Sequence, residues 1–353
     1  MSEGKESGRQ QLLDEMAEQP GVIARVLERQ LDNVRRLADE LRRRQPVALV
    51  FVARGSSDNA ATYARYLIET RNHQLTSLAA PSTVTIYGSG PYLGKSAVFA
   101  ISQSGQSEDV VAYLRHARNQ GALTVAVVND ASSPLAASAE WVLECLAGPE
   151  VSVPATKTVT AQMALLAALA TVLAGDTQCR ALMPLPGAVE RALGLRSEAA
   201  VLARQMVTAD AAAVVGRGFA YPAALEIALK LKEMTSTTAE AFSAADFFHG
   251  PVALVDPDYP VLLVDVGGRS ARAALDSAAE VARRGGKVLL VRAGEVVPLE
   301  TPAPELALRV PLAEYYTPIV AVVLGQILSF ELATARGLDP AHPRGLNKVT
   351  RTK

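Results

Sequence analysis

Apolar runs that break into polar loops and then into amphipathic stretches recur along the chain. In the most informative of them, residues 97–101 are uniformly apolar, which is typical of a strand buried on both faces of a parallel sheet. From Ser107 onward the spacing of apolar residues is that of an amphipathic helix. The pattern therefore predicts a strand, a loop rich in serine and glycine, and a helix that starts where the loop ends.

The same arrangement recurs in the second half of the chain. A shift of 163 residues places residues of the first half on matching residues of the second: Arg54 on Arg217, Gly55 on Gly218, Gly105 on Gly268, and Ser107 on Ser270. Each half alternates apolar strands with helices of roughly 12 to 15 residues, the order that builds a parallel sheet with helices on both faces. We therefore predict an α/β fold of two tandem, doubly wound, three-layer domains related by internal duplication.

The hydrophobic pattern also divides the chain. We expect five segments: an N-terminal helical segment 1–44, a first domain 45–175, a helical linker 176–204, a second domain 205–336, and an irregular C-terminal tail 337–353. Pro20 interrupts the first segment, and Pro184 and Pro186 interrupt the linker before a helical run from Val189.

The loop at residues 102–107 suits a phosphate group. It offers hydroxyls and backbone N–H groups at a helix N-terminus, where unpaired N–H groups and the helix dipole attract anions. The loop contains no lysine, which excludes a Walker-type nucleotide loop. One phosphate on a small molecule is therefore the favoured ligand, and a serine-capped helix without a ligand is the alternative.

The two copies differ where chemistry is expected. In the second half, the serine-rich loop is replaced by a loop that begins with Asp265, an acid that would repel a phosphate. The residues of the first half that match Lys230 and Glu233 are Leu67 and Thr70, which cannot carry out proton transfer. We therefore expect the first copy to hold the phosphate and the second to supply acid–base groups in one composite site.

One predicted helix of the second half carries these acid–base groups. Pro222 is placed to start it, and Glu226, Lys230 and Glu233 follow at i, i+4 and i+7 on one face. A surface salt-bridge ladder would have the same spacing. A hydroxyl-rich stretch follows and ends in His249, and a carboxylate with an imidazole is what sugar-phosphate isomerisation needs. A single histidine in an apolar setting is more often structural.

Composition narrows the class of protein. Of 353 residues, 49% are hydrophobic and 20% are charged, with a net charge of −1, which excludes a disordered chain and a basic nucleic-acid-binding surface. Cys145 and Cys179 have neither metal-ligand nor disulfide-scaffold spacing. The N-terminus lacks the apolar core of a signal peptide, and the most apolar stretch, 163–174, is too short to span a membrane. We expect a soluble, cytoplasmic enzyme with no metal, no organic cofactor, and no nucleic-acid or membrane partner.

Together these residues resemble the sugar-isomerase (SIS) family, as represented by the isomerase half of glucosamine-6-phosphate synthase. The similarity extends over almost the whole chain. It rests on Glu-Gln-Pro at 18–20, the loops at 54–57 and 102–107, the segment Gly-Pro-Glu to Thr-Lys at 148–157, the helix at 224–233, Ala-Glu-Ala at 239–241, His-Gly-Pro at 249–251, and the tail at 343–349.

The resemblance implies a phosphate site and an acid–base site. The phosphate would be held by hydroxyl and amide side chains of the two loops: Ser56, Ser57, Ser102, Gln103, Ser104 and Ser107. Glu233 would move the proton between C1 and C2, and Lys230 would lie near the reacting oxygens. Lys348 would be an amine that can form an imine with the sugar carbonyl, unless it belongs to an exposed basic tail.

The resemblance also implies a homodimer. His249 would open the sugar ring of the neighbouring subunit, and Val153 would line the sugar pocket through its backbone. Three residues depart from the family pattern: Phe248 replaces a basic residue, and Pro154 and Ala155 replace Ala-Ser. These departures concern the distal contacts to the substrate and leave the expected phosphate site intact.

One departure bears on the reaction itself. The chain begins Met-Ser-Glu and has no cysteine before Cys145, so we expect it to lack the glutamine-hydrolysing nucleophile of the synthase. The expected activity is that of an SIS-type glucosamine-6-phosphate deaminase, which releases fructose 6-phosphate and ammonia. The alternatives are an isomerase or deglycase for another amino- or fructosyl-amine sugar phosphate, a synthase subunit fed by a separate glutaminase, and, least favoured, a non-catalytic sugar-phosphate sensor.

Overall fold

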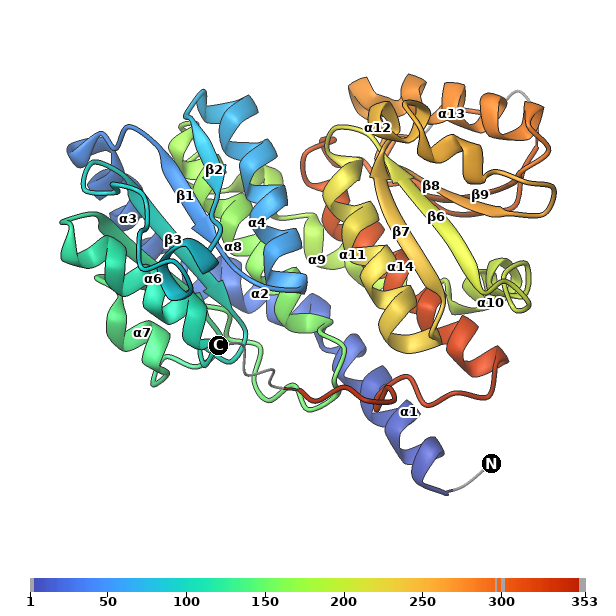
Figure 1. Cartoon of the computed structure of the whole chain (residues 1–353), viewed down its shortest axis with the longest axis horizontal. Coiled ribbons are helices and arrows are strands. Elements are labelled where there is room, and N and C mark those ends of the chain that lie inside the picture. Colours follow the sequence, from blue (N-terminus) through green and yellow to red (C-terminus); the bar gives the residue numbers. More distant parts are fainter. Residues whose placement is uncertain (1–2, 296, 300–301, 349–353) are drawn as a thin grey trace. The chain divides into compact units, whose positions relative to one another are not determined.

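The structure, a computed structural model, describes residues 3–295, 297–299 and 302–348. The chain forms two compact units (Figure 1). The N-terminal unit contains residues 21–151, 157–183 and the end of the tail from Asn347; the C-terminal unit contains residues up to Pro20, 152–156 and 184–346. Val349, the last residue of the tail motif, lies outside the described residues, as do residues 1–2 and 350–353.

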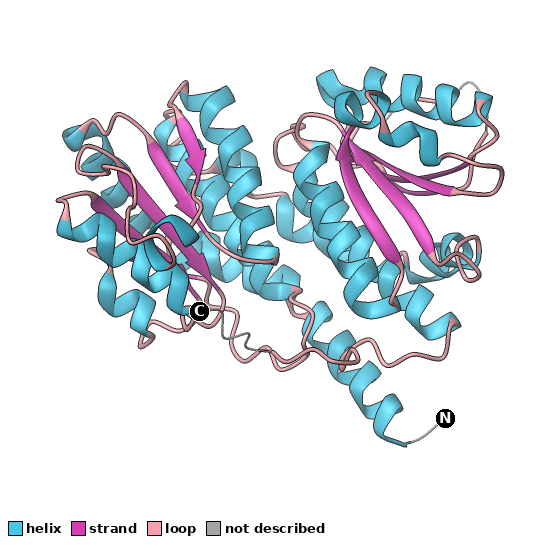
Figure 2. Cartoon of the chain, in the orientation of Figure 1, coloured by secondary structure: helices cyan, strands magenta, loops and turns pink. Residues whose placement is uncertain are grey.

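The N-terminal unit is a parallel sheet between two layers of helices (Figure 2). Its strand order is β2-β1-β3-β4-β5, from β1 (Leu49–Val52), β2 (Thr76–Leu78), β3 (Ala97–Ser102), β4 (Leu123–Val128) and β5 (Trp141–Glu144). One face carries α6 (Glu108–Asn119) and α7 (Pro134–Ser138), and the other carries α3 (Leu31–Arg44), α4 (Ser56–Leu67) and α8 (Lys157–Leu173). The smaller elements are α2 (Gln19–Arg29), η1 (Ile68–Asn72), α5 (Ser82–Thr85) and η2 (Arg180–Leu182).

The C-terminal unit repeats this plan. Its parallel strand order is β10-β9-β8-β6-β7, from β6 (Ala211–Gly216), β7 (Thr238–Ser243), β8 (Pro260–Asp265), β9 (Lys287–Ala293) and β10 (Glu305–Leu308). One face carries α12 (Ala244–Phe248), η3 (Pro251–Leu254) and α13 (Ala271–Arg283), which follows η4 (Gly268–Ser270). The other carries α11 (Ala220–Thr235) and α14 (Thr317–Ala335), with α1 (Glu3–Ala17), α9 (Leu185–Leu193) and α10 (Arg196–Arg204) outside them.

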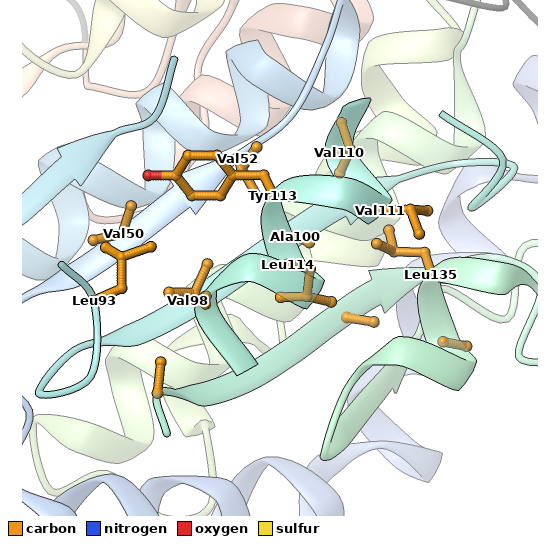
Figure 3. Packing of buried hydrophobic residues seen from close by; sticks show 14 of the residues in the cluster. Val50, Val52, Leu93, Val98, Ala100, Val110, Val111, Tyr113, Leu114 and Leu135 are labelled. Atoms are coloured by element: carbon orange, nitrogen blue, oxygen red, sulfur yellow. The ribbon is translucent and has the colours of Figure 1, made fainter. Parts of the chain in front are cut away.

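Apolar side chains cover both faces of the N-terminal sheet. Val50, Val98 and Ala100 pack against α6 and α7 in the core cluster of Figure 3. Because successive side chains of a strand point to opposite faces, Phe51 and Phe99 lie on the other side, where their rings stack at 5.2 Å between centroids. A strand buried on both faces has no place for polar residues, which explains the uniformly apolar runs in the sequence.

The two units share one topology, so the predicted duplication and fold class are confirmed. The 163-residue shift places β3 on β8 residue for residue and β1 within β6, and the strand order is the same in both sheets. In each unit, successive strands are added first toward one edge of the sheet and then toward the other. The change occurs between β1 and β3 in the N-terminal unit and between β6 and β8 in the C-terminal unit. The loops that follow these strands lie at a topological switch point, where ligands of such sheets bind.

Two helices begin earlier than the sequence pattern predicts. Helix α11 begins at Ala220, so Pro222 is its third residue rather than its first. Helix α9 begins at Leu185 and contains Pro186 in its first turn. Both prolines are tolerated because the N–H groups of a helical first turn have no partner within the helix.

The most apolar helix also differs from the expected one. Residues 163–173 of that stretch do lie in the buried helix α8, but α14 is more apolar and, at 19 residues, long enough to cross a membrane. Of the most apolar window of α14, 83% is buried inside the protein. The helix is therefore a core element of the C-terminal unit.

Candidate active site

The loop between β3 and α6 presents hydroxyls at a helix N-terminus. Ser102 is buried, and its Oγ accepts the N–H of Gly105 at 3.1 Å. The Oγ of Ser104 accepts the N–H of Gln106 at 3.3 Å, which turns the loop back on itself. Ser107 occupies the N-cap of α6 without capping it through its side chain, so its hydroxyl remains available to a ligand.

Two features hold this loop in shape: a glycine at position 105 and a hydrogen bond from the backbone of the next strand's loop. Gly105 has φ +63°, and a Cβ at this position would lie 2.1 Å from the Oγ of Ser133. The carbonyl of Gln103 accepts the N–H of Asn129 at 3.2 Å, while the Gln103 side chain is half-buried. Only glycine fits at position 105, because the left-handed φ and the close approach both exclude a side chain.

The second expected loop lies after β1. Ser56 and Ser57 are the first two residues of α4, and Gly55 before them has φ +57°. Ser57 is buried and Ser56 half-buried. The expected phosphate-binding residues thus come together at the starts of α4 and α6, which follow the neighbouring strands β1 and β3.

In the second copy, an internal carboxylate occupies the corresponding loop. The backbone N–H of Arg269 donates to Oε2 of Glu314, and a Cβ on Gly268 would collide with the same carboxylate. Asp265, which the sequence suggests as the repelling acid, contacts the same loop: its Oδ1 accepts the N–H of Gly267 at 2.8 Å, and its Oδ2 pairs with buried Arg292 at 3.0 Å. That this copy lacks a phosphate site stays a prediction, and two carboxylates, those of Asp265 and Glu314, accept N–H groups of its loop.

Helix α11 brings the three charged residues into contact. Lys230 is fully buried and its Nζ lies 2.5 Å from Oε2 of Glu233 and 3.4 Å from Oε1 of Glu226. Glu226 is 1% exposed and Glu233 is 20% exposed. The surface-ladder alternative is therefore wrong: the buried lysine is compensated by two carboxylates, of which only Glu233 reaches solvent.

His249 follows the short helix α12. It is exposed, and its ring makes no hydrogen bond with any residue that the structure describes. The preceding Phe247 is buried against Phe242 and Phe248, which anchors the turn. Phe247 is buried, whereas Phe248 and the imidazole are exposed, so the histidine is directed away from the core.

Val153 and Lys348 are the remaining predicted site residues. Val153 is half-buried and its N–H donates to the carbonyl of Ala341 at 2.9 Å, so its carbonyl is the backbone group that could line a pocket. Lys348 belongs to the N-terminal unit, whereas Lys230, Glu233 and His249 belong to the C-terminal unit. That all of them act in one composite site remains a prediction.

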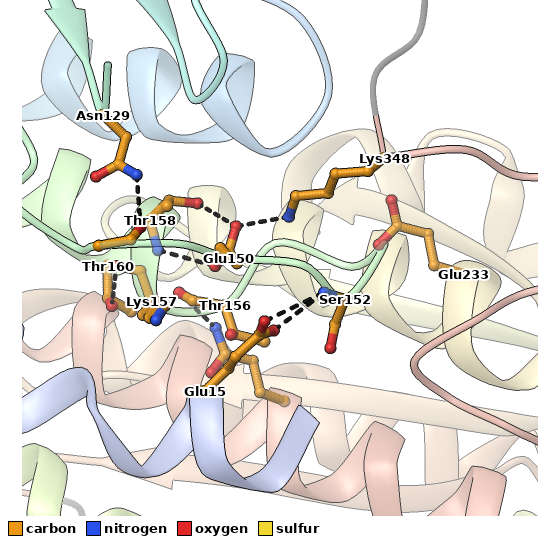
Figure 4. Close-up of polar contacts among 12 residues, drawn as sticks. Glu15, Asn129, Glu150, Ser152, Thr156, Lys157, Thr158, Thr160, Glu233 and Lys348 are labelled. Atoms are coloured by element: carbon orange, nitrogen blue, oxygen red, sulfur yellow. Dashed lines mark hydrogen bonds and ion pairs between the residues drawn. The ribbon is translucent and has the colours of Figure 1, made fainter. Parts of the chain in front are cut away.

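Glu150 is a residue that the sequence analysis missed. Its buried carboxylate accepts the N–H and Oγ1 of Thr158 at 3.1 and 2.7 Å, at the start of α8, and the Nζ of Lys348 at 2.7 Å (Figure 4). It thus joins a helix N-terminus to the expected imine-forming lysine. Its place in the Gly-Pro-Glu motif was the available signal, but the motif does not reveal a partner 198 residues away.

The cysteines take no part in these clusters. Cys145 and Cys179 are free and buried. Burial raises the pKa of both thiols, that of Cys179 to about 11, so both stay protonated and unreactive near neutral pH.

Comparisons with known proteins agree with this architecture. The SIS domain family model matches residues 43–172 and 205–335. The glutamine–fructose-6-phosphate aminotransferase [isomerizing] of Streptomyces coelicolor is 35% identical over 362 residues, which cover 96% of this chain and 58% of that protein. The Bradyrhizobium diazoefficiens enzyme of the same name is 33% identical over 95% of this chain and 57% of its own length. The chain thus spans somewhat over half the length of these curated relatives.

Solved structures extend the comparison to proteins of similar length. A Silicibacter pomeroyi protein, provisionally named a phosphosugar isomerase, has a TM-score of 0.85 at 31% identity, covering 94% of this chain and 99% of its own. The glucosamine-6-phosphate deaminase of Thermotoga maritima has a TM-score of 0.77 at 21% identity, covering 97% and 100%. The latter likeness is one of fold.

Proposed function

Because this chain belongs to the SIS domain family, we propose that it is an enzyme of sugar-phosphate metabolism, and specifically an SIS-type glucosamine-6-phosphate deaminase. It would convert glucosamine 6-phosphate and water into fructose 6-phosphate and ammonia. The relatives named as isomerising aminotransferases match this chain over its two SIS copies and support a sugar 6-phosphate as the substrate class. The observation that carries the proposal is the buried group of Glu226, Lys230 and Glu233.

The proton transfer falls to Glu233. After ring opening, its carboxylate takes the C2 proton, and the electron pair moves into a C1–C2 enolamine. Returning the proton to C1, while O1 gains a proton and the nitrogen loses one, gives a C1 alcohol and the imine at C2. While Glu233 holds the proton, Lys230 and Glu226 form a neutral buried pair, so proton uptake leaves no net buried charge in the group.

The nitrogen leaves by hydrolysis of the C2 imine. Water adds to C2, and ammonia departs as the ketone forms. Lys348 could instead replace the ammonia by transimination, and water would then release the lysine amine and fructose 6-phosphate. Its contact with Glu150 supports this role, because the buried carboxylate holds the amine in one place.

Ring opening and phosphate binding complete the proposal. His249 would move the proton between the ring oxygen and O1 of a sugar bound to the other subunit of a homodimer, and its exposed position supports this. The serine-rich loop after β3 would hold the phosphate through hydroxyls and N–H groups. No step requires a metal or an organic cofactor.

A second candidate is the same reaction run in reverse. The aminotransferase names of the curated relatives favour it, because a site that removes ammonia from the amino sugar also adds it to the ketose. With excess ammonium and fructose 6-phosphate, we expect glucosamine 6-phosphate to form.

The test is to measure ammonia and fructose 6-phosphate after adding glucosamine 6-phosphate alone to the purified chain. We expect equal amounts of both products, and Glu233→Gln is expected to lower kcat by about 10²- to 10⁴-fold. Glu198→Gln, at an exposed glutamate of α10 in the same unit and outside every motif named above, should retain activity. If neither product forms although fructose 6-phosphate binds, the deaminase proposal is wrong.

A further inference from the structure

Arg54, in the loop after β1, is held in one orientation by a buried carboxylate. Its Nε and Nη2 both lie against Oδ2 of Asp109, at 2.7 and 2.6 Å. Asp109 is 2% exposed and lies in the first turn of α6, where its other oxygen accepts the N–H of Val110 at 2.9 Å. The Arg54 side chain is 49% exposed. One edge of the guanidinium is thus fixed beside the N-terminus of α6, and Nη1 makes no hydrogen bond with any residue that the structure describes.

The second copy supplies an internal comparison. The 163-residue shift places Arg54 on Arg217 but Asp109 on Arg272. Arg217 donates to the Oγ of Ser243 at 3.3 Å, and Arg272 pairs with Asp276. In the first copy, an acid of the helix that follows the serine-rich loop therefore orients the arginine. The second copy, where Glu314 occupies the loop, lacks this pair.

The surroundings of Arg54 determine what it can contribute. Asp109 balances its charge, and Asp58 in the first turn of α4 also lies in its field, although burial raises the pKa of the Asp58 carboxyl. Arg54 therefore adds little net positive charge to the loop. Its contribution is a rigid set of N–H donors, which suits the planar, two-point contact that arginine makes with a phosphate.

We propose that Arg54 is a further phosphate-binding residue, donating its free N–H groups to the phosphate at the loop of residues 102–107, and that Asp109 is the residue that positions it. This inference rests on the proposed sugar-phosphate function. It adds a hydrogen-bond donor to the phosphate from the loop after β1. It assigns the loop after β1 a charged contact besides the hydroxyls of Ser56 and Ser57.

The test uses binding, so that it does not depend on turnover. Fructose 6-phosphate and inorganic phosphate are each titrated calorimetrically into the wild-type chain and into Arg54→Gln, Arg54→Lys and Asp109→Asn. We expect Arg54→Gln to weaken both ligands by about tenfold or more, because charge-assisted hydrogen bonds are lost. Arg54→Lys and Asp109→Asn should fall between it and the wild type. Arg65→Gln, on α4 over the ring of Tyr66, is the control and should bind like the wild type.

The outcomes separate binding from a purely structural role. If Arg54→Gln lowers the melting temperature but leaves both affinities within twofold, the inference is overturned. If Arg54→Gln does not fold, Arg54→Lys decides by the same affinity criterion. A wild type that binds fructose 6-phosphate but releases no ammonia from glucosamine 6-phosphate contradicts the proposed deaminase and leaves this inference standing. A wild type that binds neither probe overturns both.

Discussion

Burial distinguishes Lys230 from Lys232, the other lysine of α11. The spacing of Glu226, Lys230 and Glu233 places them on one face, but the same spacing serves a solvated ladder. In the structure Lys230 is fully buried, while Lys232 two residues later is exposed. The difference comes from α14, which packs along α11: a Cβ on Gly325 would lie 2.2 Å from the Ile227 side chain. Neighbouring elements decide which face of a helix is buried, and the sequence of the helix alone does not identify those neighbours.

The first prediction concerns this lysine. Lys230→Met removes the buried cation that lies between the carboxylates of Glu226 and Glu233. We expect a loss of about 3–5 kcal/mol in the free energy of unfolding. Lys232→Met, at an exposed position of the same helix, is expected to change stability by less than about 0.5 kcal/mol. Urea denaturation of both variants measures the difference, and equal stabilities would contradict the buried ion group.

At the level of elements, the loops after β1 and β3 follow from local pattern and the loop of the second copy does not. A strand, a serine-rich turn and a helix are contiguous, so their order predicts where hydroxyls and N–H groups converge. Glu314 enters the second loop from a segment that follows β10, far along the chain. Asp265 is adjacent in sequence and accepts the N–H of Gly267 in the loop, while its other oxygen pairs with Arg292 on β9.

The second prediction concerns the phosphate loop. Gly105→Ala forces a side chain into a left-handed backbone position against Ser133 and should cost about 2–4 kcal/mol. We expect it also to weaken fructose 6-phosphate binding at least about tenfold, since the loop must shift. Gly121→Ala is the control: its φ is +84°, but a Cβ there meets nothing within 4 Å. If the two variants behave alike in melting and in binding, contact with Ser133 does not shape the loop.

At the level of the whole molecule, the two copies share one topology but differ in their candidate site groups. Both copies keep the same strand order, yet only the C-terminal unit has the Glu226–Lys230–Glu233 group and only the N-terminal unit has the open serine-rich loop among the described residues. The proposed function would use the groups of both copies. His249 is exposed, and in the proposed homodimer it would act on a sugar bound to the second chain.

The third prediction tests the homodimer. His249→Ala and Glu233→Gln chains are expected to be nearly inactive alone, because each lacks one essential group in every site. After mixing under exchange conditions, half of the dimers would contain both variants, each with one intact site. We expect about a quarter of the wild-type activity. Absence of any recovery, with exchange verified by tagged chains, would mean that His249 acts within its own chain or not in catalysis.

The sequence by itself determined the α/β class, the duplication, the strand–loop–helix order and the positions of the serine-rich loop. These follow from apolar runs, helical spacing and glycines, which depend on neighbours in the chain. Only the tertiary structure decided that Lys230 is buried, that Glu150 holds Lys348, that Asp109 holds Arg54 and that Glu314 fills the second loop. Each of the last three joins residues far apart in sequence, and such pairs are set by how strands and helices pack, which no local pattern encodes.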